Sequence, residues 1–257
     1  MKNIEYHVQD NIGFITLNRP DKRNALSFET ITELKAAFLK HESDPEVKVV
    51  VLNANGPVFC AGADLGFLEK LQDSSYEQNL EDSTHLKNLL LQIYTLKKVV
   101  VAQVHGHALA GGCGLTTVCD FVYTAPDVMF GYTEVKIGFI PAIVMIFLLR
   151  KIGEAKAKQL LLSGDVVSAD YALQLGLVTK IESQGDLAES VHDFAQRLMH
   201  TNSLQAMMMT KEMIAEVQSL PLEAALTYAA EMNAKARSSE DCKRGVSAFL
   251  RKEKIVW

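Results

Sequence analysis

Two short stretches rich in glycine and alanine each follow an apolar segment, and both could do chemistry through their backbone. They are VFCAGADL (residues 58–65) and HALAGGCGL (residues 107–115). Small residues there let backbone N–H groups point at a ligand, and a helix that begins there adds the positive end of its dipole. Two such N–H groups could converge on one carbonyl oxygen as an oxyanion hole, where each donor stabilises the transition state by about 3 kcal/mol. The same glycine spacing also fits two tight turns between a strand and a helix, and it does not choose between these interpretations.

The rest of the composition argues against several other kinds of chemistry. Neither stretch contains the G-x-x-x-x-G-K-[ST] pattern of a phosphate-binding loop, and neither matches a dinucleotide-binding fingerprint. The net charge of −5 and the lack of a basic cluster argue against a nucleic-acid partner. The apolar run at residues 138–149 is too short to span a bilayer, so we expect no membrane partner.

The cysteines indicate a cytoplasmic protein without a metal site. None of the four belongs to a C-x-x-C pair, and no histidine stands at metal-ligand spacing from them. The N-terminal ten residues lack the apolar segment of a signal peptide. We therefore expect reduced thiols and a cytoplasmic location. The cysteines are Cys60, Cys113, Cys119 and Cys242.

The elements that must position these loops alternate between strand and helix in the first part of the chain. Helices are predicted at residues 27–44, with Ser27 as the N-cap, and at residues 76–97. Strands separated by helices of this length favour parallel pairing with right-handed crossovers, and so an α/β fold. The predicted strands are residues 12–18, 47–54, 99–106 and 120–125.

From about residue 185 the pattern changes to consecutive amphipathic helices. Such helices have few ways to bury their apolar faces alone, so we expect them to pack on another subunit. The predicted organisation is an α/β core over residues 1–190, which carries the site, and a C-terminal helical region over residues 191–257. The predicted helices are residues 186–200, 203–219, 222–238 and 240–254.

Five motifs occur in the order typical of one protein family. The chain resembles the crotonase superfamily, the enoyl-CoA hydratases and isomerases, over essentially its whole length. The resemblance implies a spiral of ββα units, a C-terminal helical part that forms trimers or dimers of trimers, and acyl-CoA thioester substrates. No separate cofactor is expected, because coenzyme A is part of the substrate. The motifs are NRPDKRNALS (18–27), FCAGADL (59–65), GHALAGGCGL (106–115), CDFVYTAPDVMFGYTEVKIGFIP (119–141) and SADYALQLGLV (168–178).

The resemblance also assigns roles to individual residues. It places the oxyanion hole on the backbone N–H groups of Ala63 and Gly111, and it makes Glu134 the acid/base, with a surface structural acid as the alternative. Lys22 or Arg23 would meet a phosphate of coenzyme A, unless the two are simply a solvated pair. The full substrate and coenzyme A set is Lys22, Arg23, Ala25, Leu26, Ala61, Asp64, Leu65, Gly112 and Gly114.

One departure from the family pattern concerns the number of carboxylates. Typical hydratases of the family place a glutamate three residues after the oxyanion glycine, and this chain has Gly114 there. Residues 138–149 also lack the G-[AG]-G-G run that follows the proline in many hydratases. In this respect the chain resembles branches of the family that act on 3-methylglutaconyl-type thioesters. We expect the bare position 114 to leave room for a water or a branched acyl group.

Three functions therefore remain open, and the first is favoured. An enoyl-CoA hydratase or dehydratase would use Glu134 as acid and base, and each positioned group typically contributes about 10²–10⁴-fold. A Δ3-Δ2 enoyl-CoA isomerase needs only one such group, so the single glutamate suits it. A non-catalytic or RNA-binding homologue fits poorly with the acidic net charge. We expect His105, His107 and Asp120 to tie elements together rather than to do chemistry.

Overall fold

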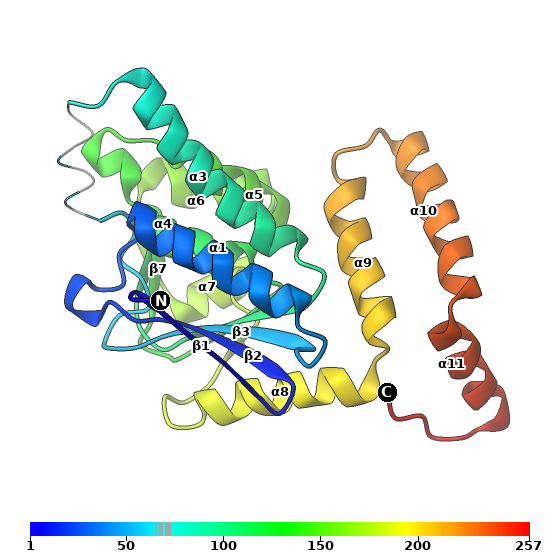
Figure 1. Ribbon diagram of the computed structural model, residues 1–257. Helices are drawn as coiled ribbons and strands as arrows, with labels where there is room; N and C mark the ends of the chain where they lie inside the picture. Colours follow the sequence, from blue (N-terminus) through cyan, green and yellow to red (C-terminus); the bar gives the residue numbers. More distant parts are fainter. Residues whose placement is uncertain (65, 67–68, 70–72) are drawn as a thin grey trace.

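The computed structural model describes residues 1–64, 66, 69 and 73–257, and its centre is a mixed sheet (Figure 1). The strands of this sheet follow the order β1-β2-β3-β4-β6-β9. Strands from β2 to β9 pair in parallel, and β1 pairs antiparallel with β2. The α/β class predicted from the sequence is confirmed. The bounds are β1 Ile4–Gln9, β2 Ile12–Leu17, β3 Val49–Ala54, β4 Val99–Val104, β6 Phe121–Thr124 and β9 Lys180–Ile181.

The central strands form because their residues are β-branched or apolar on both faces. The side chains of Val49, Val50, Val51 and Leu52 in β3 are fully buried, as parallel strands covered by helices require. All four predicted strands are present. The sequence did not reveal β1, whose exposed polar residues and edge position give it a weak pattern.

Helices cover both faces of the large sheet. Helix α1 (Phe28–Ser43) begins as predicted, because the Ser27 side chain accepts a hydrogen bond from the Thr30 N–H at 3.2 Å. Helix α3 (Tyr76–Thr95) packs beside α1, and α8 (Leu187–Thr201) covers β4 and β6 from the other face. The remaining core helices are α4 (Gly111–Val118), α5 (Ala142–Ile152), α6 (Glu154–Ser163) and α7 (Ala169–Leu175).

A second, smaller sheet begins with a strand inside the second glycine-rich stretch. It contains β5 (Ala108–Leu109), β7 (Met129–Gly131) and β8 (Val166–Ser168), in that order. The chain also forms two short 3₁₀ helices, η1 (Pro20–Lys22) between β2 and α1 and η2 (Glu134–Ile137) after β7.

The last three helices form what we call the C-terminal arm, residues 204–257 (Figure 1). Helix α9 (Leu204–Val217) lies against the core, and α10 (Leu222–Ser238) and α11 (Glu240–Arg251) extend beyond it. The predicted boundary at residue 190 falls within α8, which packs on the sheet, so the division into two regions stays a prediction. No helix in the described part of the chain is long and apolar enough to cross a membrane.

Candidate active site

Segments from four parts of the chain lie side by side next to the large sheet. An isolated parallel bridge joins Leu26 to Ala63, and another joins Cys60 to Ala108. Strand β5 then pairs in parallel with β7, with Ala108 opposite Phe130. Because parallel segments end at one edge, the residues that follow these pairs are brought together there.

The two predicted oxyanion donors are in register at this edge. Ala63 and Gly111 each lie three residues after the bridged pair Cys60 and Ala108. A Cβ built on Gly62 would lie 3.5 Å from the backbone nitrogen of Gly111, so the two loops are in close contact. The structure therefore brings the two glycine-rich stretches together, as the oxyanion interpretation requires.

The N–H of Ala63 points away from the segment that it bridges. The Leu26 N–H donates to the Gly62 carbonyl at 2.8 Å, and the Asp64 N–H donates to the Leu26 carbonyl at 3.2 Å. In a parallel bridge the residue between these two positions directs its own N–H to the opposite side. Ala63 is also exposed, so a ligand can reach this N–H.

The N–H of Gly111 is the first donor of helix α4, and N–H groups of a first helical turn have no partner within the helix. The preceding Ala110 N–H is already bound to the Gly131 carbonyl at 2.7 Å. Ala110 has a positive φ of 48° with ψ −123°, a conformation that is strained for a residue with a Cβ. This strained turn aims the start of α4 at the same edge as Ala63.

Gly112 has a packing role that the sequence did not reveal. A Cβ at this position would lie less than 3.0 Å from the carbonyl oxygen of Cys60. Any larger residue would push the two donor loops apart. The prediction that Gly112 contacts substrate stays untested, because the structure explains this glycine through the loop contact alone.

Glu134 follows the third segment, at the start of η2 just after β7. Its side chain is half-buried, and within the described part of the chain its Oε2 atom is buried and accepts no hydrogen bond. Burial raises the pKa of this carboxyl, against a smaller lowering by its own backbone N–H. A carboxyl whose pKa is raised by burial holds a proton more readily than an exposed one, which suits a group that must both take and give a proton.

Tyr132 anchors the segment that carries Glu134, and the sequence analysis missed it. Its side chain is completely buried, and its hydroxyl lies 2.5 Å from Oγ1 of Thr117 in α4. Thr117 Oγ1 in turn donates to the Cys113 carbonyl at 2.9 Å. The segment that carries Glu134 and the helix that begins at Gly111 are therefore joined by buried hydrogen bonds. Tyr132 stands two residues before Glu134 in GYTEVKIG, but that stretch does not show that the tyrosine is buried.

The expectation of an empty space beside Gly114 is wrong. A Cβ built on Gly114 would lie less than 3.0 Å from Cγ1 of Val144 and 4.0 Å from Cδ1 of Leu90. Val144 belongs to the first turn of α5 and is buried, and Leu90 in α3 is completely buried. The valine side chain has taken the space in which a water or an acyl branch was expected.

The predicted coenzyme A loop lies beside the first glycine-rich stretch. The Ala61 N–H donates to the Arg23 carbonyl at 3.0 Å, and Arg23 and Asn24 both adopt positive φ. Lys22 and Arg23 are exposed, whereas Ala25 and Leu26 are buried. The two cations can therefore reach a phosphate, and the buried pair shapes the loop.

Two polar side chains hold this loop in place. Asn24, which the sequence analysis missed, is buried and donates to the carbonyls of Asn55 and Val58, both at 2.8 Å. Asp64 forms a 3.0 Å salt bridge with Arg19, so its carboxylate is engaged in structure. The predicted contact at Leu65 lies outside the described residues.

The other polar candidates tie elements together, as expected. His105 Nε2 lies 2.6 Å from the Gly56 carbonyl, and His107 Nδ1 accepts from the Met129 N–H at 3.1 Å. Asp120 accepts from the Val100 N–H and from Lys211 of α9, both at 2.7 Å. A cavity of about 750 Å³ lies beside this last contact, between the core and α9. None of the three predicted catalytic residues lines it.

Comparisons with known proteins agree with the geometry. Residues 7–257 match the family model described as enoyl-CoA hydratase/isomerase. A Thermus thermophilus protein, provisionally named an enoyl-CoA hydratase, is 40% identical over 242 residues, or 94% of this chain and 95% of that protein. The crotonyl-CoA hydratase of Syntrophomonas wolfei is 32% identical, over 98% of this chain and 96% of its own. The crystal structure of an enoyl-CoA hydratase from Mycobacterium smegmatis has a TM-score of 0.93 at 30% identity and covers 100% of this chain and 99% of its own. The predicted crotonase-like fold is confirmed.

Proposed function

Because the chain belongs to the enoyl-CoA hydratase/isomerase family, we propose that it adds water to, or removes it from, the C2=C3 bond of an enoyl-CoA thioester. The observation that carries this proposal is the position of Glu134. Its half-buried carboxyl follows the same edge on which the N–H groups of Ala63 and Gly111 lie in register. Two relatives with named activities, a crotonyl-CoA hydratase and a short-chain-enoyl-CoA hydratase, support it.

The proposed chemistry needs one carboxylate and two backbone donors. The thioester carbonyl oxygen accepts hydrogen bonds from Ala63 and Gly111, while the Glu134 carboxylate accepts a proton from a water. The water oxygen bonds to C3, and the electron pair of C2=C3 moves toward the carbonyl oxygen as an enolate. Glu134 then returns the proton to C2, which gives the 3-hydroxyacyl thioester. The two N–H groups stabilise the oxygen while it carries negative charge.

Coenzyme A enters with the substrate, so no separate cofactor is proposed. The exposed side chains of Lys22 and Arg23 would contact its phosphates, and the backbone near Ala25 and Ala61 would contact its adenine. The support for this is that the two segments are hydrogen-bonded to one another, through Ala61 and Arg23, directly beside the donor Ala63.

A second function, Δ3-Δ2 enoyl-CoA isomerisation, is favoured by one specific observation. Position 114 carries no side chain and its space is filled by Val144, so this position supplies no second carboxylate. In isomerisation Glu134 alone would take a proton from C2 and return it to C4. A branched, methylglutaconyl-type acyl group stays a prediction, and its branch would have to lie elsewhere than beside Gly114.

We also propose that the chain forms trimers or dimers of trimers. The C-terminal arm supports this, because α11 presents Val246, Phe249 and Leu250 to solvent at helical spacing and none of its residues is buried in the described chain. No nucleic-acid partner is proposed.

The function is tested by following the absorbance of the conjugated thioester with two substrates. Crotonyl-CoA loses this absorbance on hydration, whereas a 3-enoyl-CoA such as 3-hexenoyl-CoA gains it on isomerisation. We expect loss with crotonyl-CoA that depends on enzyme concentration. Gain with 3-hexenoyl-CoA alone would favour the isomerase, and no change with either substrate would contradict both functions.

A further inference from the structure

The contact between Gly114 and Val144 lies next to the proposed oxyanion hole. Gly114 is one helical turn after the donor Gly111, and residues three apart lie on the same face of an α-helix. Side chains of a helix lean toward its N-terminus, so a side chain at position 114 would extend back over the turn that carries Gly111. The methyl groups of Val144 occupy that space.

The valine and the proposed acid/base belong to one short segment. Glu134 opens η2, and Val144 lies ten residues later in the first turn of α5. The loop between them is held at its start, because the Phe139 N–H donates to the Glu134 carbonyl at 3.1 Å. The Met145 N–H donates to the Pro141 carbonyl at 2.9 Å and holds its end. The two groups are therefore placed together by local structure.

The wall beside the donor is apolar and closely packed. Val144 is 4% exposed, and a Cβ on Gly114 would meet both its Cγ1 and, at 4.0 Å, Cδ1 of Leu90. A close-packed wall of this kind discriminates by size, and one methyl group typically changes a specificity ratio by about 10-fold or more.

We propose that Val144 is the residue that determines acyl specificity at this site, by excluding a branch at C3 of the enoyl group. This proposal rests on the proposed function, since it assumes that the thioester oxygen binds at Ala63 and Gly111. Position 114 is glycine because Val144 needs the space, so the two residues form one size-matched pair.

The first experiment measures specificity in the Val144→Ala variant. Relative to wild type, the ratio of kcat/KM for 3-methylcrotonyl-CoA to that for crotonyl-CoA is expected to rise about 10-fold. Val191→Ala in α8 is the matched control, because it removes the same atoms from a fully buried site on the other face of the sheet. An unchanged ratio in Val144→Ala, or an equal rise in Val191→Ala, would overturn the proposal.

A binding measurement separates this proposal from the proposed function. The dissociation constants of isovaleryl-CoA and butyryl-CoA, measured by calorimetry, need no turnover. In Val144→Ala the dissociation constant of isovaleryl-CoA is expected to fall relative to that of butyryl-CoA by a similar factor, even if neither enoyl substrate reacts. If the enzyme turns over neither substrate and this ratio still shifts, the proposed reaction is wrong, but the thioester still binds at this site and Val144 still excludes the branched acyl group.

A second experiment tests the size-matched pair through thermal unfolding. Gly114→Ala alone should lower the melting temperature by about 5 °C, because its Cβ must displace Val144. The double variant Gly114→Ala/Val144→Ala should melt above Gly114→Ala, since the second change makes room for the first. Gly185→Ala is the control, because a Cβ there meets only Ser183 Oγ at 3.9 Å. Additive losses in the double variant would contradict the pairing.

Discussion

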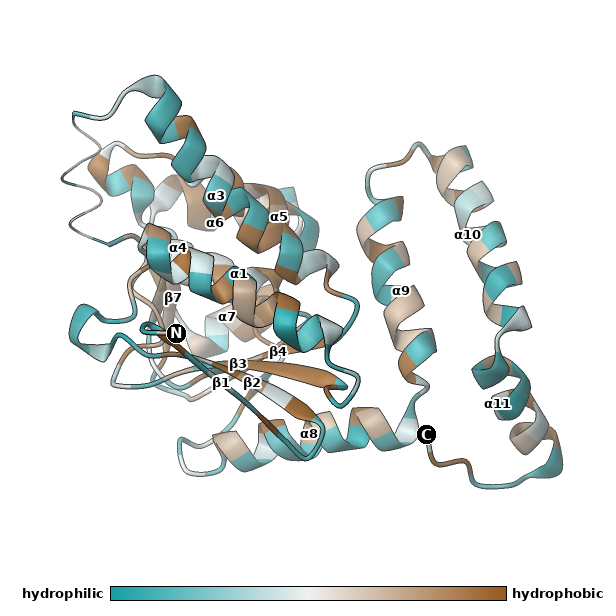
Figure 2. Cartoon of the chain, in the orientation of Figure 1, coloured by the Kyte–Doolittle hydropathy of each residue, from teal (hydrophilic) through white to brown (hydrophobic). Residues whose placement is uncertain are grey.

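Helix α4 in the core and helix α11 in the C-terminal arm both carry apolar side chains, yet the chain buries them very differently. In α4 the side chains from Cys113 to Val118 are buried against the sheet and the neighbouring helices. In α11, within the described chain, no residue is buried, and Phe249 and Leu250 are 81% and 74% exposed. Figure 2 shows the same contrast as brown strands at the centre and mixed colours along the arm.

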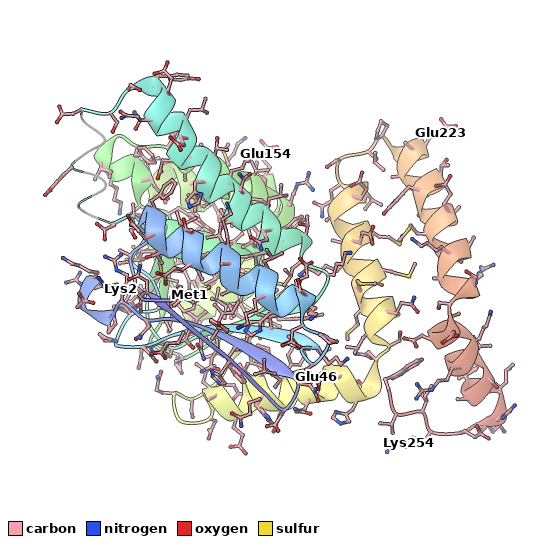
Figure 3. All side chains as sticks on the ribbon, in the orientation of Figure 1. Met1, Lys2, Glu46, Glu154, Glu223 and Lys254 are labelled. Atoms are coloured by element: carbon pink, nitrogen blue, oxygen red, sulfur yellow. The ribbon has the colours of Figure 1, made fainter. Side chains whose placement is uncertain are left out.

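The other side chains of the core and of the arm show the same difference in burial as α4 and α11. Core side chains fill the space between sheet and helices, whereas side chains of α10 and α11 project to both sides between Glu223 and Lys254 (Figure 3). The described arm buries little beyond Met209, Lys211 and Met232. Trp257 contacts Arg244 and Gly245 of the arm, and its backbone N–H donates to the carbonyl of His200 in α8 at 3.4 Å. The core therefore buries its apolar side chains within one chain, whereas the described arm leaves many of its own exposed.

The largest effect is expected from a substitution that removes the proposed acid/base group and leaves the core and the arm folded. Glu134→Gln keeps the shape of the side chain and removes its ability to carry a proton. We expect kcat to fall about 100-fold or more, with KM for crotonyl-CoA little changed. Steady-state kinetics on crotonyl-CoA measure this, and sedimentation should show the same assembly as wild type. Turnover close to wild type would contradict the role of Glu134.

The next largest effect is expected from breaking the salt bridge that joins the arm to the core. Lys211 of α9 donates to Asp120 at 2.7 Å and to the Lys98 carbonyl at 3.0 Å, and its side chain is only 10% exposed. Lys211→Met leaves the Asp120 carboxylate without its charged partner, which should lower the free energy of unfolding by about 3 kcal/mol. Urea unfolding measures this loss.

Two controls sharpen that measurement. Adding Asp120→Asn to Lys211→Met should restore part of the loss, because the unpaired charge is removed. Lys158→Met breaks an exposed pair with Glu154 and should leave the stability close to that of wild type, because solvent screens this pair. Equal losses of stability in Lys158→Met and Lys211→Met would show that burial does not make the Lys211–Asp120 salt bridge more important for stability.

The two regions also differ in what the sequence could predict. Central strands such as β3 were predictable because both faces are apolar, and α1 was predictable from the Ser27 cap. Strands β5, β7 and β8 were missed because a strand of two or three residues is too short to show an alternation of apolar and polar side chains. The arm's helices were predictable from their periodicity, but that pattern does not show which face finds a partner.

The candidate site was predictable where backbone chemistry dictates the residue type. Glycine and alanine at Ala63 and Gly111 were visible in the sequence because the donor must be bare. The filling of position 114 by Val144 was not, since it joins residues 30 apart on two helices and depends on how closely α4 and α5 pack. Asn24 and Tyr132 were missed because a buried hydrogen bond leaves no pattern.

A smaller effect on stability, but a visible one on assembly, is expected from the arm. Phe249→Asp places a charge in the apolar stripe of α11 and should dissociate the oligomer to a species of 28.4 kDa in sedimentation. Because Phe249 is 81% exposed, the stability of the monomer should change by less than about 0.5 kcal/mol. Arg251→Asp, on the opposite face of the helix, should leave the assembly unchanged. A Phe249→Asp protein of wild-type size would contradict the arm's proposed role.

The smallest expected effect is a loss of folding stability in acid, which we attribute to the buried side chain of His41 in α1. This side chain is 1% exposed, its Nε2 lies 3.2 Å from the Phe14 carbonyl, and its buried Nδ1 has no partner in the described chain. Burial lowers the pKa of His41 below its ordinary 6.5, in spite of a raising effect from the Phe14 carbonyl and Asp44.

The sign of the pH dependence follows from this lowered pKa. Below pH 6.5 the unfolded chain binds a proton at His41 that the folded chain does not, so stability is full above pH 6.5 and is lost as the pH falls toward the folded pKa. One proton sets an upper limit of about 1.4 kcal/mol per pH unit on the slope. Urea unfolding between pH 7.5 and pH 5 should therefore show a steeper loss for wild type than for His41→Leu. His7→Gln, at an exposed position of β1, should keep the wild-type slope, and equal slopes in wild type and His41→Leu would rule out His41 as the source.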